Sequence, residues 1–286
     1  MRQFRFVFAL ALALTVASFP MSQSRADDVD DALKAASDAL RSGDNDKALK
    51  AAEEAVKLDP KKAMAWFLRA EAKAKVRKHE EAIKDYEKAF ELDKKLLAAI
   101  NQRGGERFRM GLVKESVEDF ETYIKANPKA YDDHWRYGIS LYYAGRPADG
   151  AKQFKAGEGA FGNDVENIFW HYLCNAKVDG VEKARKAMLT LAKQGDSRAY
   201  MMKVNDLIRG KAKPEEVIEA AEKAKLDGEQ KTEFLFYAHL YVGLNYEAEG
   251  NSKKCIEHLT AAVEKYKISH YMWDVGNVHL MLLKKR

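Results

Sequence analysis

The stretch SGDNDKALKAAEEAVKLDP, residues 42–60, sets a pattern that returns at a fixed interval along the chain. The matching stretches are VRKHEEAIKDYEKAFELDK (76–94), MGLVKESVEDFETYIKANP (110–128) and AGRPADGAKQFKAGEGAFG (144–162). Each begins 34 residues after the one before it. Self-similarity at such a period indicates a repeat architecture, in which each unit is a small motif that buries its apolar face by stacking on its neighbours.

The aligned landmarks show what each unit must be. A turn position holds Gly43, Arg77, Gly111 and Gly145, and a small-residue position holds Ala48, Ala82, Ser116 and Gly150. A second small-residue position holds Ala70, Gly104 and Gly138, and the unit ends at Pro60, Lys94, Pro128 and Gly162. Small residues let two antiparallel helices touch, so we expect Gly138 to lie against Gly150. Glycine tolerates the positive φ of the turn, and proline separates one hairpin from the next.

A period of 34 with these landmarks resembles the tetratricopeptide repeat (TPR) family. The resemblance covers most of residues 29–165 and 234–269. It implies an all-α protein: a TPR α-solenoid of antiparallel helix pairs, with protein binding as the expected activity. Composition agrees, because charged residues of both signs make up 33% of the chain and only 5 prolines occur, which favours helices.

The repeats suggest a layout for the whole chain. Four N-terminal TPR repeats are expected over residues 27–163. Another copy, FYAHLYVGLNYEAEGNSKKCIEHLTAAVEKY, places Gly243, Tyr246, Gly250 and Ala262 at TPR positions. The C-terminal region 234–286 is therefore expected to hold one repeat plus a capping helix, SHYMWDVGNVHLMLLKKR, that covers the open end of the stack.

Residues 164–233 fit the period poorly but keep a helical pattern. The stretch VENIFWHYLCNA spaces its apolar residues as one face of a helix. Asp179-Gly180 predicts a turn before VEKARKAMLTLAK, Pro214 predicts a helix start, and Asp227-Gly228 predicts the end of that helix. We expect two degenerate helical hairpins here.

The first 26 residues have the three parts of a secretory signal peptide. Arg2 and Arg5 precede an apolar run from Phe6 to Phe19, and Ser24-Arg25-Ala26 forms a cleavage site of the small-x-small type. The apolar run is too short to span a bilayer comfortably, and no lipidation cysteine follows it. We expect an exported protein, periplasmic or secreted, without stable membrane insertion after signal cleavage.

Removal of residues 1–26 also changes the charge. The full chain carries +5, and the removed segment holds three arginines and no acid, so the mature chain carries +5 − 3 = +2. This small net charge of mixed sign offers no electrostatic reason for binding nucleic acid or an anionic membrane.

The two cysteines, Cys174 and Cys255, lie among apolar residues in helical patterns. Export permits a disulfide, but buried small side chains are the favoured interpretation. Cys255 and His258 are spaced to share one helix face, yet a structural zinc site needs four ligands. No metal and no cofactor are therefore expected.

GEGAFG, residues 157–162, has the spacing of a dinucleotide-binding fingerprint. That fingerprint needs a strand before it and a helix after it, whereas a repeat helix precedes these glycines. We interpret them as a helix end and junction. The chain also lacks HExxH and a glycine-loop lysine, so we expect no catalytic residues and no enzyme.

Without a catalytic or metal site, the expected function is binding at the protein surface. The first helix of each TPR hairpin lines the concave side of the superhelix, and repeats that start at 29, 63, 97 and 131 place aromatic and charged residues there. The candidate partner-binding groove consists of Phe67, Asn101, Phe108, Arg109, Trp135, Arg136, Tyr142 and Tyr143. Such a groove suits an extended peptide or a partner helix. Packing between adjacent repeats is the competing role for these aromatic residues.

The chain lacks the lysines and asparagines of the two-carboxylate clamp by which some TPR domains bind acidic C-terminal peptides; Leu33 and Ser37 occupy two of those positions. The stretches DDHWRYGISLYYAGRPADGAKQF and YVGLNYEAEGNSKKCIEHLTAAV are similar to TPR adaptor proteins of bacterial envelopes. The leading hypothesis is an exported, non-enzymatic adaptor for a protein or peptide partner. The alternatives are a self-assembling envelope scaffold (a homo-oligomer) and, third, an enzyme or metal protein that uses Trp170, His171 or Cys174 of the central segment.

Overall fold

The computed structural model of the protein describes residues 21–285, and every regular element within that range is a helix. Most of the expected signal peptide lies outside the described residues; residues 21–26 begin the first helix. The expectation of an all-α fold is confirmed for the described part of the chain.

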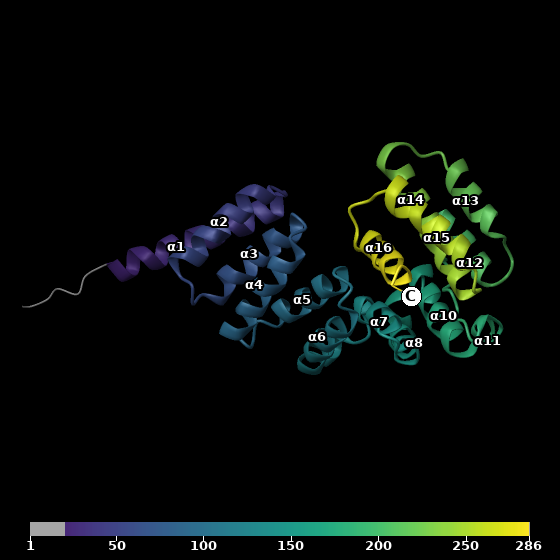
Figure 1. Ribbon diagram of the computed structural model, residues 1–286, viewed down its shortest axis with the longest axis horizontal. Helices are drawn as coiled ribbons and strands as arrows, with labels where there is room; N and C mark the ends of the chain where they lie inside the picture. The colour runs from purple at the N-terminus through teal and green to yellow at the C-terminus, as the bar shows by residue number, and fades with distance from the viewer. Residues whose placement is uncertain (1–20, 286) are drawn as a thin grey trace, which may run out of the picture.

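The four expected N-terminal hairpins are present. They are formed by α1 (Met21–Ser42) with α2 (Asn45–Leu58), α3 (Ala63–Lys75) with α4 (His79–Leu92), α5 (Leu97–Arg109) with α6 (Val113–Ala126), and α7 (Trp135–Tyr143) with α8 (Pro147–Ala156). A single 3₁₀ turn, η1 (Pro128–Ala130), precedes the fourth hairpin. Each second helix packs on the first helix of the next hairpin, so the four form the stacked arm at the left and centre of Figure 1.

The repeat landmarks have the geometry that their residue types require. The turn residues Gly43, Gly111 and Gly145 have φ values of 78°, 73° and 79°, and Arg77 adopts the same conformation at 60°. A Cβ atom on Gly150 would lie 3.2 Å from the carbonyl oxygen of Gly138. The expected close approach of these two glycines is therefore confirmed, and it explains why a side chain is absent from both.

Hairpins two and three each contain a buried aspartate that pairs with two cationic side chains, at positions 34 residues apart. Arg69 Nε lies 2.7 Å from Asp85 Oδ2, and Lys73 Nζ lies 2.8 Å from the same oxygen. Thirty-four residues later, Arg103 and Arg107 lie 2.6 and 2.7 Å from Asp119 Oδ1. Hairpin four has Tyr137, Leu141 and Gln153 at these places.

The middle of the chain is helical but less regular than expected. It contains α9 (Glu158–Phe161), α10 (Val165–Asp179), α11 (Val181–Lys186), α12 (Ala199–Ile208) and α13 (Pro214–Lys223). Only the first part of VEKARKAMLTLAK is helical, and residues 187–198 are irregular. Arg198 holds this irregular segment to the start of α10 through ion pairs of 2.9 Å with Asp164 and 2.7 Å with Glu166.

One expected boundary was wrong. Asp227-Gly228 does not end the helix that starts at Pro214, because α13 already ends at Lys223. Instead, Asp227 is the N-cap of α14 (Gly228–Ala248). This helix runs without a break across the expected boundary between residues 233 and 234. Its first six residues, 228–233, are glycine and polar residues, and its buried apolar residues begin at Leu235.

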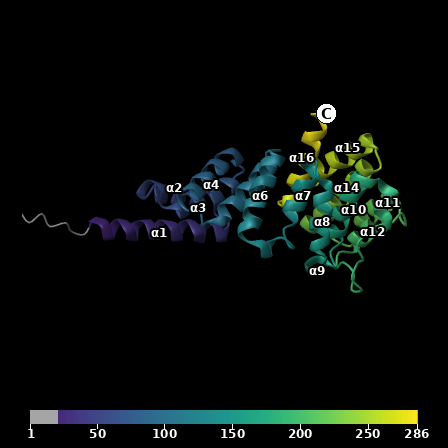
Figure 2. The same cartoon turned by 90° about the horizontal axis from the view of Figure 1, so that it is seen from below.

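The last hairpin pairs α14 with α15 (Ser252–Thr260), which continues as a π-helical turn, η2 (Ala261–Lys265). The expected terminal helix is α16 (Tyr271–Leu283). It packs against α15 and η2 of the last repeat, as a cap would, and also against α5 of the third hairpin. Figures 1 and 2 both show α16 between the last hairpin and the inner side of the N-terminal arm, beside α7.

The largest buried cluster lies in the C-terminal half, where Trp170, Tyr172, Phe236 and Tyr241 meet. The first hairpins have smaller clusters that consist mainly of alanine. Cys174 and Cys255 are both buried and form no disulfide in the described structure. Across residues 21–285, no helix combines the length and apolar character required to cross a bilayer.

Candidate functional site

The side chains of the N-terminal arm that contact α16 are called the inner face; they are Arg77, Phe108, Arg109, Trp135, Arg136 and Tyr143. Tyr271, the first residue of α16, is the main point of contact. Its ring stacks on Phe108 at 5.6 Å between centroids and meets the edge of Trp135 at 5.3 Å. The guanidinium groups of Arg109 and Arg136 lie 4.9 and 6.0 Å from the Tyr271 centroid. Four of the eight predicted groove residues therefore surround one side chain of the same protein.

Space for this contact comes partly from a glycine on α5. A Cβ atom on Gly105 would lie 3.0 Å from Arg136 Nη1 and 3.9 Å from the Tyr271 ring. A larger residue at this position would push the Arg136 side chain away from the inner face. Gly105 thus allows α5 and α16 to approach.

One turn further along α16, the buried carboxylate of Asp274 accepts hydrogen bonds from two arginines. Arg77 Nη2 lies 2.8 Å from Asp274 Oδ1, and Arg109 Nε lies 2.7 Å from Asp274 Oδ2. Arg109 also pairs with Glu106, whose other oxygen lies 2.6 Å from His79 Nδ1. The network joins residues separated by up to 197 positions.

Electrostatics match this arrangement. Burial opposes the charge of Arg109, but the Glu106 and Asp274 carboxylates outweigh that effect and raise the pKa of Arg109. Burial also raises the pKa of Tyr271. The arginine is therefore charged and the tyrosine neutral across the whole physiological range of pH.

A polar cleft of about 280 Å³ remains between the inner face and the start of α16. Its lining includes Glu71, Arg77, His79, Gln102, Glu106, Arg109, Arg136, His270, Tyr271 and Asp274. Two buried polar atoms of lining residues, His79 Nε2 and Tyr271 Oη, have no hydrogen-bond partner within residues 21–285. A buried polar group without a partner is costly. The many polar side chains of the lining suit the cleft to a ligand that forms hydrogen bonds.

A second cavity, of about 200 Å³, is more apolar. It is lined by Trp135, Ile139, Phe154, Phe161, Asp164, Glu166, Asn167, Trp170, His270 and Met272. His270 lines both cavities, and the Trp135 ring contacts Tyr271 of the polar cleft. Half-buried Trp135 is therefore the predicted groove residue with the best position to contact a partner.

The structure corrects the accessibility expected for two groove residues. Tyr142 is only 3% exposed and its ring lies 5.8 Å from Trp170, so it belongs to the core. Phe108 is fully buried beneath Tyr271 and Tyr143. The repeat pattern placed both on the first helix correctly, but it could not show that α10 and α16 cover them.

The remaining predicted residues take other positions. Phe67 is half-buried and its ring lies 5.8 Å from Tyr86. Asn101 Oδ1 lies 2.9 Å from His134 Nε2 and accepts a hydrogen bond from Arg136 at 3.2 Å. The Tyr143 hydroxyl lies 3.0 Å from Nδ1 of His279 in α16.

Sequence reasoning missed the partners on α16: Tyr271, Asp274 and His279. Asp274 and His279 lie 34 residues after Leu240 and Asn245, which are unlike them, so the repeat offers no signal for these two. Tyr271 lies 34 residues after Tyr237 and could have been found by the step. The periodic acids Asp85 and Asp119 do follow the step and could have been found by it.

Comparisons with known proteins agree with this fold. A family model described as tetratricopeptide repeat matches residues 33–95. A TPR protein from Parabacteroides merdae is 13% identical, with a TM-score of 0.59, and covers 90% of this chain and 99% of its own. The C-terminal part of a TPR repeat-containing protein from Cytophaga hutchinsonii is 14% identical, with a TM-score of 0.53 and coverage of 85% and 98%.

MamA from Desulfovibrio magneticus, residues 41 to its end, is 14% identical with a TM-score of 0.52; it covers 56% of this chain and 90% of its own. A search of curated proteins finds no match. At these identities the structural likeness concerns the fold alone. The chain carries tetratricopeptide repeats and folds as a TPR α-solenoid, an architecture whose concave surface serves protein–protein interaction in other proteins.

Proposed function

We propose that the protein is an exported, non-enzymatic adaptor that binds a protein or peptide partner on the inner face of its TPR arm. One observation carries this proposal: the predicted groove residues already hold a helix, α16, through ring stacking and arginine–carboxylate pairs. A surface that accepts one helix in this way has the chemistry to accept another segment.

The two cavities beside α16 suggest what a partner would contact. Trp135 offers an aromatic surface, and aromatic residues often supply most of the binding energy at an interface. Glu71, Gln102 and Arg136 in the lining of the polar cleft offer hydrogen-bonding groups to a polar ligand, such as the backbone of a peptide. The inner face carries arginines and carboxylates together, which favours a partner of mixed charge.

Export is the part of the proposal that rests on residues 1–26. Expression of the full chain in a bacterial host should yield a mature protein that begins at Asp27. N-terminal sequencing of the protein from the envelope or secreted fraction tests this directly. An uncut chain in the cytoplasm would contradict export without affecting the binding proposal.

Replacing Trp135 with alanine should weaken partner binding at least about 30-fold, since truncation of a central interface aromatic costs about 2 kcal/mol or more. The measurement is a crosslinked pull-down with tagged residues 27–286, followed by titration of the captured partner. Far-ultraviolet circular dichroism verifies that the variant is folded.

Trp66→Ala is the matched control. Trp66 is also half-buried, but it donates a hydrogen bond to the Pro60 carbonyl and lines neither cavity. Capture lost only in Trp135→Ala supports the groove, and equal capture by both variants refutes it. Crosslinks only between copies of the chain would favour the self-assembling scaffold. Tyr142→Ala is unsuitable as a probe because it would open a cavity in the core.

A further inference from the structure

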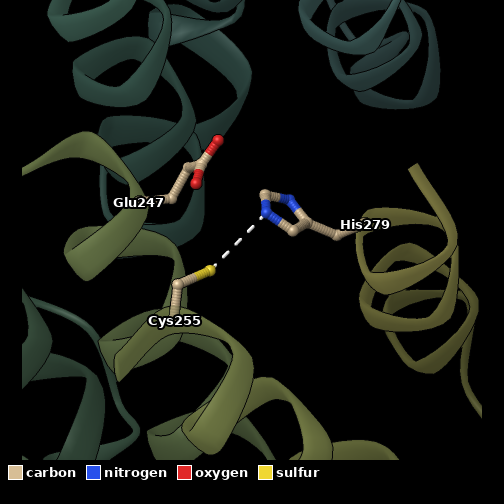
Figure 3. Close-up of side chains that lie close together, drawn as sticks. All are labelled: Glu247, Cys255 and His279. Carbon is tan, nitrogen blue, oxygen red and sulfur yellow. Dashed lines mark hydrogen bonds between the residues drawn. The ribbon is translucent and has the colours of Figure 1, made fainter. Parts of the chain in front are cut away.

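Three potential metal ligands from three helices meet where α16 joins the last hairpin. Glu247 lies in α14, Cys255 in α15 and His279 in α16, and one ligand atom from each lies within 4.8 Å of the others. Figure 3 shows the Cys255 sulfur and the Glu247 carboxylate on one side and the His279 ring approaching from the other. Cys255 and His279 are buried, and Glu247 is half-buried.

We propose that these three side chains bind one zinc-class divalent ion. The distance from Cys255 Sγ to His279 Nε2 is 3.6 Å. A tetrahedral zinc ion with bonds of about 2.3 Å to sulfur and about 2.1 Å to nitrogen holds the two ligand atoms about 3.6 Å apart. The pair therefore has the required separation, and the Glu247 carboxylate lies within 4.8 Å of both ligand atoms.

The chemistry of the set also fits. Thiolate, imidazole and carboxylate are the ligand types that zinc uses in proteins. Binding replaces the Cys255 S–H bond with a sulfur–metal bond and releases that proton to solvent. The charges of Cys255 and Glu247 then balance the two positive charges of the ion. A water molecule can take the fourth position, on the half-exposed side of Glu247.

The other ring nitrogen of His279, Nδ1, has a hydrogen-bond partner, as histidine ligands in metal sites commonly do. His279 Nδ1 lies 3.0 Å from the Tyr143 hydroxyl. A proton on Nδ1 that is donated to this oxygen leaves the lone pair of Nε2 directed toward the sulfur. Histidine ligands commonly donate their other N–H group in this way. Tyr143 thus acts as a positioning residue from the inner face.

The pair Cys255 and His258, for which the sequence analysis expected no metal, does not form this cluster. His258 points to His239, with the two Nδ1 atoms 3.1 Å apart. Since Cys255 is fully buried, a role as a nucleophile for an external substrate is disfavoured. An ion at Cys255 and His279 would fasten α16 to the last hairpin, five residues after Asp274 contacts the inner face.

The test uses the reduced chain, residues 27–286, freed of metal by a chelator and titrated with Co²⁺ and then Zn²⁺. We expect one Co²⁺ per chain, with the thiolate-to-cobalt charge-transfer absorption and visible bands of a tetrahedral ion. Zn²⁺ should abolish these bands and raise the unfolding temperature. Absence of a charge-transfer band at stoichiometric binding overturns the proposal.

Cys255→Ala should lower the affinity for Co²⁺ at least about 100-fold, more than the 10- to 100-fold loss typical of an outer-shell partner. Alanine fits the position because Ala48 and Ala82 occupy the equivalent place in the first two repeats. Cys174→Ala is the matched control: Cys174 is equally buried, and its affinity and spectrum should be unchanged. Equal binding by both variants contradicts the site.

Two further variants separate ligand loss from misfolding. Glu247→Gln keeps the side-chain size and should weaken binding while preserving the thiolate band. Tyr143→Phe should weaken binding about 10-fold, as expected for an outer-shell partner. If neither variant changes the affinity, the ion binds elsewhere and the proposal is wrong.

Discussion

Asp119→Asn should lower the free energy of unfolding by about 3–5 kcal/mol, because it leaves two buried arginines without their shared partner. Asp119 is 4% exposed at its side chain, and Arg103 and Arg107 are 13% and 19% exposed. Burial opposes the charge on Arg103, while the hydrogen bond and attraction from Asp119 raise its pKa. Because the ordinary pKa of arginine lies far above neutral pH, the guanidinium stays charged even when the carboxylate is removed.

Urea unfolding followed by circular dichroism measures this effect. Glu118→Gln is the matched control, since Glu118 is the exposed neighbour of Asp119 on α6 and should change stability by no more than about 0.5 kcal/mol. Glu87 also lies near, with Oε1 3.7 Å from Arg103 Nη1. A loss below about 1 kcal/mol for Asp119→Asn would contradict the prediction and show that water or Glu87 compensates the arginines.

Hairpin four has uncharged side chains at the positions that Arg103, Arg107 and Asp119 occupy in hairpin three. Its Tyr137, Leu141 and Gln153 replace the charged set, and the Tyr137 hydroxyl donates a hydrogen bond to Glu121 at 3.2 Å. The triple variant Arg103→Tyr, Arg107→Leu, Asp119→Gln copies this set, and Glu87 stands 34 residues before Glu121 to receive the new hydroxyl. We expect it to be more stable than Asp119→Asn, since exchanging a whole buried ion pair costs less than breaking one.

Stability should also fall steeply as the pH drops from 7.5 to 5. Burial, with Arg136 nearby, lowers the pKa of His134 to about 4, and burial, with Lys155 nearby, lowers that of His171 to about 4. The ordinary value in an unfolded chain is about 6.5. Between these values the unfolded state binds more protons, so stability is fully present above about pH 6.5 and is lost as the pH falls toward 4.

The hydrogen bonds of His134 explain why its neutral form is required. Its Nδ1 accepts the backbone N–H of Tyr137 at 3.2 Å and so caps α7, while Nε2 lies 2.9 Å from Asn101 Oδ1. A proton on Nδ1 would place a donor against a donor. Each of the two histidines then contributes a loss of about 2 kcal/mol between pH 7.5 and pH 5.

Urea midpoints at both pH values measure this loss. His134→Asn provides the control, because asparagine is a good N-cap and does not titrate in this range. The variant should lose about 2 kcal/mol less than the parent chain over the same interval. An unchanged pH dependence would show that His134 does not take part.

Much of the fold could be predicted because the repeat is local. The positive φ of the turn is indicated by Gly43, Gly111 and Gly145. The contact between two helices that follow one another in the chain is indicated by Gly138 and Gly150. The middle segment was less predictable. The pattern VEKARKAMLTLAK predicts a helix through Lys193, yet residues 187–198 are irregular, and Arg198 forms ion pairs with Asp164 and Glu166 at the start of α10.

The candidate site, too, was predicted only in those parts that follow from the local repeat. The sequence by itself determined the TPR period, the hairpins and the placement of Phe108, Arg109, Trp135 and Arg136 on first helices, since all of these follow from a step of 34 residues. Only the tertiary structure decided that α16 covers them. Asp274 meets Arg77 across 197 positions, and Cys255 meets His279 across two helices. The apolar sequence of the terminal helix predicts that the helix is buried. The surface against which it packs depends on how the whole stack of helices is arranged in space.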